Sequence, residues 1–396
     1  CHWYIGDRMS TINVNAIDKE SGSTLTLGGS GTTVNVSNMV PDVALSNRNL
    51  IIGGAMNVAQ RATQVTGVTT SGYRTCDRFA FDMSALGTWT VDQSTDSPNV
   101  FSNSFKLTCT TADASPAADD YAILYYSIEA QNLQHLGFGT ADAKSLTLSF
   151  WVKSNKTGSA SAELIQDDNS NKLFSNSYTI NSADTWEYKT ISIPADTAGI
   201  INNDNGAGLN LGIWLNSGST FTGGSHATTW AALNQTNRNV SNLAVGGAVN
   251  DYFAITGVQL EVGDVATPFE HESFGQTLAK CQRYYEKSYK YSDAPGTATD
   301  AGMVSAYYSG IIGTNQAFAI YFKQNKRTAP TMSGWDGSGN ASKCSYWTAG
   351  NSRTDNPSQS SYHFPRAGES SVMFNISDLN TNARQFGTHF VADAEL

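Results

Sequence analysis

Pairs of acidic residues are the first candidates for chemistry in this chain. Asp119-Asp120, Asp167-Asp168 and the lone Asp204 occur in polar segments. Two carboxylates held roughly 5–10 Å apart can cleave a glycosidic bond, one as general acid and the other as base or nucleophile. All five residues lie among turn residues, where Asp favours hydrogen bonds within its own loop. We therefore predict that they are structural, that the chain has no catalytic residues and that it is not an enzyme.

Motifs for metal binding and nucleophilic catalysis are missing from the sequence. None of the six histidines lies in HExxH or another ligand spacing, and there is no GxSxG motif and no P-loop. The cysteines are scattered without a CxxC pair: Cys1, Cys76, Cys109, Cys281 and Cys344. An odd, sparse set of this kind predicts buried thiols rather than a disulfide framework or a zinc site.

A glycine-rich stretch near the C-terminus carries the candidates for ligand binding. Trp335, Tyr346, Trp347 and Tyr362 lie there among Ser, Asn, Asp and Gly. Sugar rings can stack their apolar C–H faces on aromatic side chains, while polar neighbours bind the hydroxyls. Because binding residues concentrate on loops carried by a rigid scaffold, we predict that these four lie on exposed loops and contact a glycan or a surface protein. The alternative is that they fill the core of a small domain.

Two tryptophans further upstream, Trp151 and Trp214, lie on strand-like segments. They could line a concave sugar-binding face. Packing in the core or between subunits is the favoured interpretation, because large aromatic side chains are mostly buried and are enriched at interfaces.

The elements that must position these residues are strands. In "SLTLSFWVKS", Leu146, Leu148, Phe150 and Val152 share one face, while Thr147, Ser149, Trp151 and Lys153 share the other, which is the period-2 pattern of a half-buried strand. Similar runs recur across residues 47–272, separated by Gly, Asn, Asp and Ser. They predict an all-β chain whose main domain is an antiparallel jelly roll, or β-sandwich. One short helix is expected to end at Gly137.

At Pro268 the pattern changes from strands to a helix. Ser273 followed by Gln276 resembles a capping box. The apolar residues beyond it keep helical spacing: Leu278, Cys281, Tyr285 and Tyr289. We predict a connecting helix over residues 273–291 as a short, stiff linker. Residues 292–396 return to short strands and predict a second, smaller C-terminal β-sandwich domain, the candidate distal receptor-binding tip.

Composition and charge exclude several classes of function. Charged residues make up 15% of the chain, against roughly 25% in an average soluble domain. The net charge is −10, and no run of Lys or Arg could neutralise a row of phosphates, so we expect no nucleic-acid partner. No apolar stretch is long enough for a membrane span and no secretory signal is recognisable, so we expect no membrane insertion and synthesis in the cytoplasm.

Residues 1–46 form a thin leading arm. Leu25 and Leu27, then Val34 and Val36, alternate with polar residues on either side of a glycine-rich turn, which predicts two short strands. So small a segment cannot offset its conformational entropy alone. We predict that three copies wrap around a shared axis in a homotrimer. The alternative is a mobile arm.

Five segments in order resemble tail-fibre and related virion proteins of bacteriophages, notably marine and cyanobacterial ones. They are "NLIIGGAMNVAQRAT" (49–63), "TLSFWVKS" (147–154), "WEYKTISIPADTAG" (186–199), "ITGVQLEVGDVATPFEHESFGQTLAKCQRYYEKS" (255–288) and the terminal "ADAEL". The central block is also similar to carbohydrate-binding jelly-roll modules, in which a strand opening with an Asn-Leu pair lies near the last strand. Here these would be Asn49-Leu50 and Val258–Glu261. Such modules often hold a structural calcium ion, and no other cofactor is expected.

The resemblance implies a receptor-binding adhesin of the virion, assembled in the host cytoplasm. The N-terminal region would bind other phage tail proteins, and distal parts would bind host surface polysaccharide or an outer-membrane receptor. Two alternatives stay open: a tailspike that depolymerises polysaccharide, and a capsid-decorating or connector fibre with no receptor role. The first is disfavoured because the chain lacks the repeated stacking period that would build a long parallel β-helix.

Overall fold

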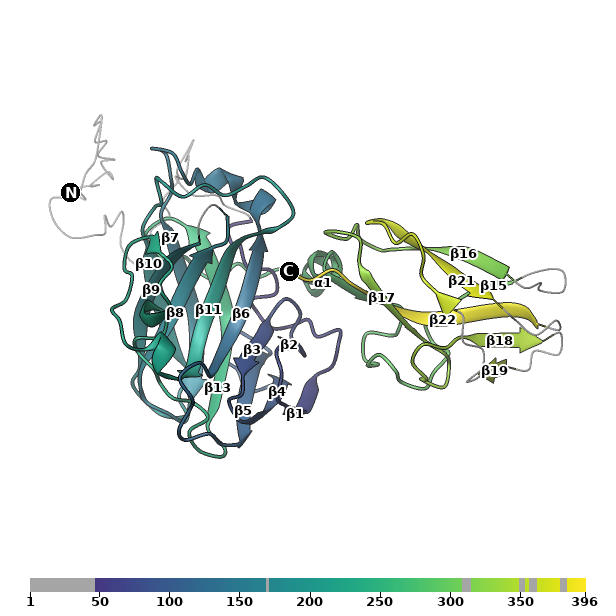
Figure 1. Cartoon of the computed structure of the whole chain (residues 1–396), viewed down its shortest axis with the longest axis horizontal. Helices are drawn as coiled ribbons and strands as arrows, with labels where there is room; N and C mark the ends of the chain where they lie inside the picture. The colour runs from purple at the N-terminus through teal and green to yellow at the C-terminus, as the bar shows by residue number, and fades with distance from the viewer. Residues whose placement is uncertain (1–46, 169–170, 308–314, 349–352, 356–361, 378–382) are drawn as a thin grey trace, which may run out of the picture. The chain divides into compact units, whose positions relative to one another are not determined.

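The structure is a computed structural model that describes residues 47–168, 171–307, 315–348, 353–355, 362–377 and 383–396. The described chain is built mostly of antiparallel strands, which confirms the predicted all-β class (Figure 1). The leading arm with its two expected strands and its predicted trimer contacts lies outside the described residues. Within these ranges no helix is long and apolar enough to cross a bilayer.

The main domain is a sandwich of two antiparallel sheets. The six-stranded sheet has the order β1 (Gln64–Val68), β4 (Thr88–Ser94), β5 (Ser104–Thr111), β13 (Tyr252–Val262), β7 (Leu146–Ser154) and β10 (Glu187–Ile193). The seven-stranded sheet has the order β12 (Ala231–Ala232), β9 (Lys172–Ile180), β8 (Gly158–Gln166), β11 (Ala207–Ser217), β6 (Tyr121–Glu129), β3 (Ala80–Ser84) and β2 (Gly72–Tyr73).

The inner faces of these sheets form one core. In β7, Leu146, Leu148, Phe150 and Val152 are all buried in it, as the alternation predicts. The opposite sheet contributes residues such as Leu124, and chain segments between the strands contribute others. The period-2 pattern is therefore a true signal of which face packs inward.

The short helix predicted before Gly137 is a 3-10 helix, η1 (Ala130–Leu136). Its residues Leu133 and Leu136 are buried, and Gly137 takes the left-handed conformation at its end with φ 61°. A glycine tolerates this conformation without a steric penalty, which is why the helix can stop there.

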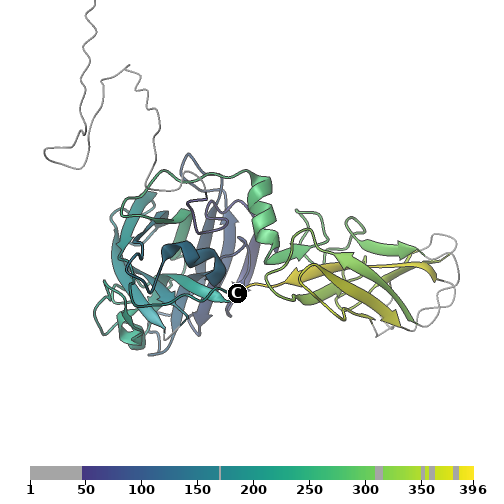
Figure 2. The same cartoon turned by 90° about the horizontal axis from the view of Figure 1, so that it is seen from above.

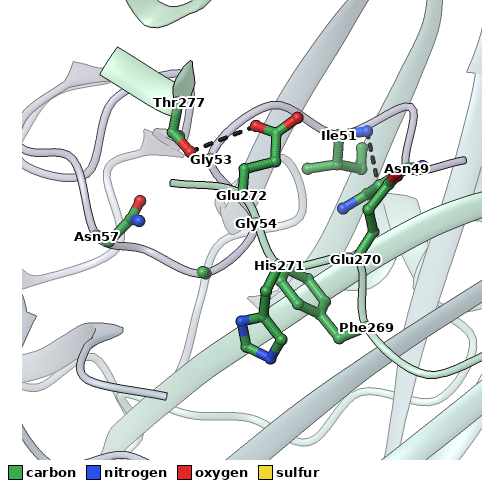
Figure 3. Close-up of a pocket in the computed structure, with 11 residues that line it drawn as sticks. Asn49, Ile51, Gly53, Gly54, Asn57, Phe269, Glu270, His271, Glu272 and Thr277 are labelled. Atoms are coloured by element: carbon green, nitrogen blue, oxygen red, sulfur yellow. Dashed lines mark hydrogen bonds between the residues drawn. The ribbon is translucent and has the colours of Figure 1, made fainter. Parts of the chain in front are cut away.

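The two ends of the sandwich domain meet, as the similarity to jelly-roll modules implies. The Leu50 amide donates to the Leu260 carbonyl at 2.8 Å. The side chain of Asn49 donates to Val258 O at 3.0 Å and accepts from the amides of Leu260 and Ile51 at 3.1 and 3.0 Å. Asn49 and Glu270 line a small hollow of about 50 Å³ at this junction (Figure 3). The Asn49 and Glu270 side chains both hydrogen-bond to backbone groups at this junction, which gives this hollow a structural role.

The connecting helix is shorter than predicted. Helix α1 (Phe274–Gln282, Figure 2) begins at Ser273, whose capping box with Gln276 is present as expected. It ends at Gln282, and Tyr285 already belongs to strand β14 (Tyr285–Lys287). The prediction of a helix through residue 291 is therefore wrong. Apolar spacing continued, but pairing of β14 with the last strand of the chain determines the backbone there.

The C-terminal part contains two further sheets. One has the order β14, β22 (Ala383–Asp393), β18 (Ser345–Thr348) and β19 (Arg353–Asp355), with β15 (Val304–Tyr307) and β17 (Thr331–Trp335) also paired with β22. The other has the order β16 (Asn315–Tyr321), β21 (Ser371–Ser377) and β20 (Tyr362–His363). Phe374 from the second sheet and Phe386 from the first meet in one core cluster. The sheets thus pack face to face around it.

The last residues return to the sandwich domain and form a buried ionic contact. Ala394 donates its amide to Tyr284 O at 2.7 Å. The carboxylate of Glu395 pairs with Arg78, whose side chain is 1% exposed, and with Arg61 at 3.3 Å. The Arg78 guanidinium also lies 3.5 Å from the centre of the Tyr284 ring. These contacts tie the end of the described chain to both the linker and the sandwich.

Candidate functional site

A hollow of about 350 Å³ opens on the outer face of the seven-stranded sheet, over strands β6 and β11, which lie side by side (Figure 1). We call it the β6–β11 hollow. Its lining combines aromatic, acidic, amide and guanidinium groups: Asp82, Asp119, Tyr121, Ile123, Trp214, Thr220, Phe221, Gln235 and Arg238. Concave sites with a few polar groups around an apolar surface are the usual form of small-ligand sites.

Strand register brings these residues together. Trp214 of β11 lies opposite Ile123 of β6, and Ile123 lies opposite Asp82 of β3. Leu124, the next residue along β6, points into the core, so Tyr121 and Ile123 must face outward. The outer face of this sheet therefore carries large apolar side chains as well as the inner face.

Three aromatic rings form the apolar part of the hollow. The centre of the Trp214 ring lies 5.2 Å from that of Phe221 and 6.4 Å from that of Tyr121. Trp214 is 1% exposed and Phe221 8%, whereas Tyr121 is half-buried. Tyr121 is thus the most exposed of the three rings, and both of the others meet it edge to face.

The indole nitrogen of Trp214 has no hydrogen-bond partner within the described part of the chain. A buried N–H without a partner costs free energy, and most buried donors in folded proteins are satisfied. The nitrogen itself has almost no exposed surface, so a ligand in the hollow cannot reach it directly.

Arg238 closes one side of the hollow. Its guanidinium forms a two-pronged pair with Glu163, with Nε–Oε2 at 3.0 Å and Nη2–Oε1 at 2.6 Å, and lies 4.9 Å from the Trp214 ring centre. Nη1 donates to Gln235 Oε1 at 3.0 Å. Burial by itself would lower the pKa of Arg238, but the hydrogen bonds and charge of Glu163 raise it, so the group stays a cation.

Two carboxylates stand at the other side. Asp82 accepts from Ser71 Oγ at 2.6 Å and from the Tyr121 hydroxyl at 3.3 Å. Asp119 accepts from Thr220 Oγ1 at 2.6 Å. Burial, and then the charge of Asp82, raise the pKa of the Tyr121 phenol, which therefore stays a neutral donor.

Polar groups continue along the same face of β11. Asn210 lies opposite Ser127 of β6 and donates through Nδ2 to Asp167. Its Oδ1 is buried and finds no partner among the described residues. Along β11, Asn210 is four residues from Trp214, or about 13 Å. The unpartnered indole N–H of Trp214 and the unpartnered Oδ1 of Asn210 therefore lie on the same face of the sheet.

The four residues predicted for binding are not brought together in a loop cluster. Trp335 ends β17, half-buried, and its ring centre lies 6.2 Å from that of Tyr289. Tyr346 and Trp347 belong to β18; Tyr346 is buried in the core, and Trp347 is half-buried. Tyr362 lies in β20. The expectation of exposed loops is corrected here, because ladder pairing with neighbouring strands organises this stretch.

The strands that carry Trp335 and Trp347 share one neighbouring strand, β22. Both strands pair with β22, where Trp335 lies opposite His389 and Trp347 opposite Gln385. The hollow found in this domain, about 310 Å³, is lined by other residues: Pro330, Met332, Ser342, His363, Phe364 and Ala367.

The two upstream tryptophans lie on different sheets. Trp151 of β7 is half-buried and packs against Tyr188 of β10, with ring centres 5.4 Å apart. Trp214 belongs to the β6–β11 hollow described above. The sequence placed Trp214 among the candidates, but it missed Tyr121 and Arg238. The signal for Tyr121 is in "YAILYYSIE", where aromatic and apolar residues occupy both parities of the strand.

Asp120 and Asp204 accept hydrogen bonds within their own turns, as turn chemistry predicts, whereas Asp119, Asp167 and Asp168 accept from segments 34 or more residues away. The partners are Thr220 for Asp119, the Ala117 amide for Asp120, Asn210 for Asp167, Asn202 for Asp168 and the Gly206 amide for Asp204. The cysteines Cys76, Cys109, Cys281 and Cys344 are buried free thiols, which confirms that prediction for the described ones. Across the described ranges, no three His, Cys, Asp or Glu side chains are grouped so as to hold a metal ion.

No family model matches the sequence, and no curated protein matches it. Solved structures do match. The enzymatically active domain of tailspike protein 4 from bacteriophage CBA120 is 13% identical, the match covers 54% of this chain and 21% of that one, and the TM-score is 0.29. The chain thus spans about a fifth of the tailspike structure.

Carbohydrate-binding modules are similar at the same level. A CBM4 module is 10% identical over 46% of this chain and 78% of its own length, with a TM-score of 0.24. The TmCBM61 module, in complex with β-1,4-galactotriose, is 8% identical over 55% of this chain and 100% of its own, with a TM-score of 0.27.

Proposed function

We propose that this chain binds carbohydrate, without cleaving it, in the β6–β11 hollow. The observation that carries the proposal is the half-buried ring of Tyr121, which lines the hollow together with the carboxylates of Asp82 and Asp119. A pyranose stacked on Tyr121 would present its hydroxyls at the rim of the ring. There the carboxylates of Asp82 and Asp119 can accept hydrogen bonds from them.

Two substitutions in the hollow test this. Tyr121→Ala removes the stacking surface, and we expect binding of a screened oligosaccharide to weaken about fivefold to tenfold. Trp214→Phe shortens the buried ring that packs against Tyr121, and we expect it to cost about 0.5–1.5 kcal/mol of binding free energy. Tyr321→Ala is the matched control, because Tyr321 is 78% exposed and belongs to the C-terminal domain. Folded Tyr121→Ala protein that binds as tightly as the Tyr321→Ala control would contradict the proposal.

The wider role that we propose is that of a homotrimeric tail-fibre adhesin of a bacteriophage, located in the virion. The resemblance of five sequence segments to phage fibre proteins supports it. Three rigidly linked sugar sites would raise avidity by about 10²–10⁴ over one site. The mass of the purified full chain in solution tests the trimer, and labelled antibodies on virions distinguish a tail position from a capsid one. A monomer or a capsid position would overturn this part.

The depolymerase alternative and the C-terminal aromatics are tested separately. Release of new reducing ends from host surface polysaccharide by purified protein would establish cleavage and overturn the non-catalytic proposal. For the C-terminal domain, Trp335→Ala and Trp347→Ala should each reduce adsorption to host cells if these half-buried rings contact the receptor. Folded variants with unchanged adsorption would leave the β6–β11 hollow as the candidate site.

A further inference from the structure

The charges around the β6–β11 hollow do not balance. Asp82, Asp119 and Glu163 contribute three carboxylates, and Arg238 contributes one guanidinium, so the local sum is 1 − 3 = −2. Among the lining residues that the structure describes, Arg238 is the one cation. An acidic ligand would therefore need Arg238 as its partner.

The charge of Arg238 is already compensated. Its Nε and Nη2 are held in a fork by Glu163, whose side chain is 0% exposed, and its Nη1 donates to Gln235. A buried carboxylate that lost its cation would be left uncompensated, which is strongly unfavourable. Drawing Arg238 away from Glu163 would incur this cost, and the two N–H groups that remain belong to a guanidinium whose charge Glu163 already neutralises.

Asp82 and Asp119, by contrast, keep acceptor capacity. A carboxylate has about four lone-pair sites. Asp119 receives a hydrogen bond from Thr220, and Asp82 receives bonds from Ser71 and Tyr121. Asp119 is exposed and Asp82 half-buried, so both can take further donors from solvent or ligand. Hydroxyl and ammonium groups are donors, whereas ionised acids have none.

From these contacts we infer that the β6–β11 hollow selects neutral or amino-bearing glycans and excludes glycans that carry uronic acids or sulfate. The inference rests on the proposed carbohydrate binding and names the ligand class of the same site. Two carboxylates facing a ligand anion at contact distance repel it enough to weaken binding about tenfold or more. Because the groups are partly open to solvent, added salt reduces the discrimination.

The test is binding of the full chain to an array of oligosaccharides of matched length that are neutral, aminated, uronate-containing or sulfated. We expect the neutral and aminated probes to bind at least about tenfold more tightly than the anionic ones. The double variant Asp82→Asn with Asp119→Asn should narrow the difference, and so should about 0.5 M salt. Asp264→Asn, at an exposed acid in the loop after β13, is the control, and it should leave the difference in affinity between neutral and anionic probes unchanged.

The outcomes separate this inference from the proposal beneath it. Binding of anionic probes as tightly as neutral ones overturns the charge selection and leaves carbohydrate binding standing. Selection that persists unchanged in the double variant also overturns it, because the repulsion would then come from other groups. Absence of binding to every class of probe overturns the proposed function, and the selection with it.

Discussion

Replacing Glu395 by Gln should destabilise the protein more than any other loss of a single charge at the junction of the C-terminal tail with the sandwich. The Glu395 side chain is 5% exposed and pairs with two arginines. Arg61 keeps other carboxylates nearby, Asp393 at 3.1 Å and Asp77 at 3.9 Å. Among the described residues, Arg78 keeps only neutral partners, including Ser127 O at 2.6 Å and the Tyr284 ring.

The expected loss of unfolding free energy follows from this difference between Arg61 and Arg78. Removing one partner of a buried ion pair leaves an uncompensated charge and costs about 3–5 kcal/mol. Gln keeps the shape of Glu, so the loss reports the charge and not a cavity. Asp393→Asn is the matched control, because Asp393 pairs with the same Arg61 but is 40% exposed. A pair of that exposure contributes about 0–1 kcal/mol.

Urea unfolding followed by tryptophan fluorescence measures both variants. We expect the midpoint to fall in Glu395→Gln with an unchanged slope, and to stay within error of the parent in Asp393→Asn. The reasoning is refuted if the two variants lose the same free energy of unfolding. That result would mean that solvent reaches Arg78 and compensates its charge.

Three further predictions concern the fold. Ser273→Ala removes the cap of α1 and should cost about 1 kcal/mol of unfolding free energy; no loss in urea unfolding would contradict the role of the capping box. Gly54→Ala would drive a Cβ into the carbonyl oxygen of Val258 and should cost about 1–3 kcal/mol, whereas Gly275→Ala, with open space around it, should cost nothing; equal melting temperatures would contradict this. Burial lowers the pKa of His389, partly offset by its hydrogen bond to Thr299 O, so the unfolded state binds the proton more tightly. The unfolding free energy should therefore fall as the pH drops below the ordinary value of 6.5, and His389→Gln should lose this dependence; a parent and a variant with the same slope between about pH 7 and about pH 5 would contradict it.

The sequence predicts local structure well where one face of a strand is buried. The alternation of Leu146 to Val152 and the capping box at Ser273 are both found. It fails at Tyr285, whose helical spacing is overridden by pairing with β22, a strand near the other end of the chain. The same holds for Tyr346, where polar neighbours indicate a loop and the ladder to β22 makes a core residue. Pairing across long sequence distances is not contained in a local pattern.

The candidate site could be predicted only in part for the same reason. Trp214 stands out by its residue type, but Tyr121 and Arg238 come from segments far away in the sequence. Register between β6 and β11 places Tyr121 near Trp214, and the chain after β11 brings Arg238 back over the sheet. The apolar residues on both parities of β6 indicate that its outer face is covered, but no local pattern indicates which strand or loop covers it.

Strand β11 shows why a hollow forms at this place. An antiparallel sheet usually has one wet face, yet Gly208 to Ser217 are buried along the whole strand. The cover is the chain after β11, which includes η2 (Ser219–Phe221) and η3 (Gln235–Asn237).

This cover is fastened to the sheet by small polar side chains. Ser161 of β8 exchanges hydrogen bonds with the backbone of Ser241, at 3.0 and 3.1 Å, and Ser175 of β9 donates to Asn237 O at 2.7 Å. Arg238 therefore has a fixed position at the edge of this covering segment, and it lines the same hollow as the half-buried ring of Tyr121. Binding residues held by a fastened loop lose little entropy when a ligand arrives. The β6–β11 hollow thus lies at the edge of the segment that covers this sheet face, and its residues are held in place before a ligand binds.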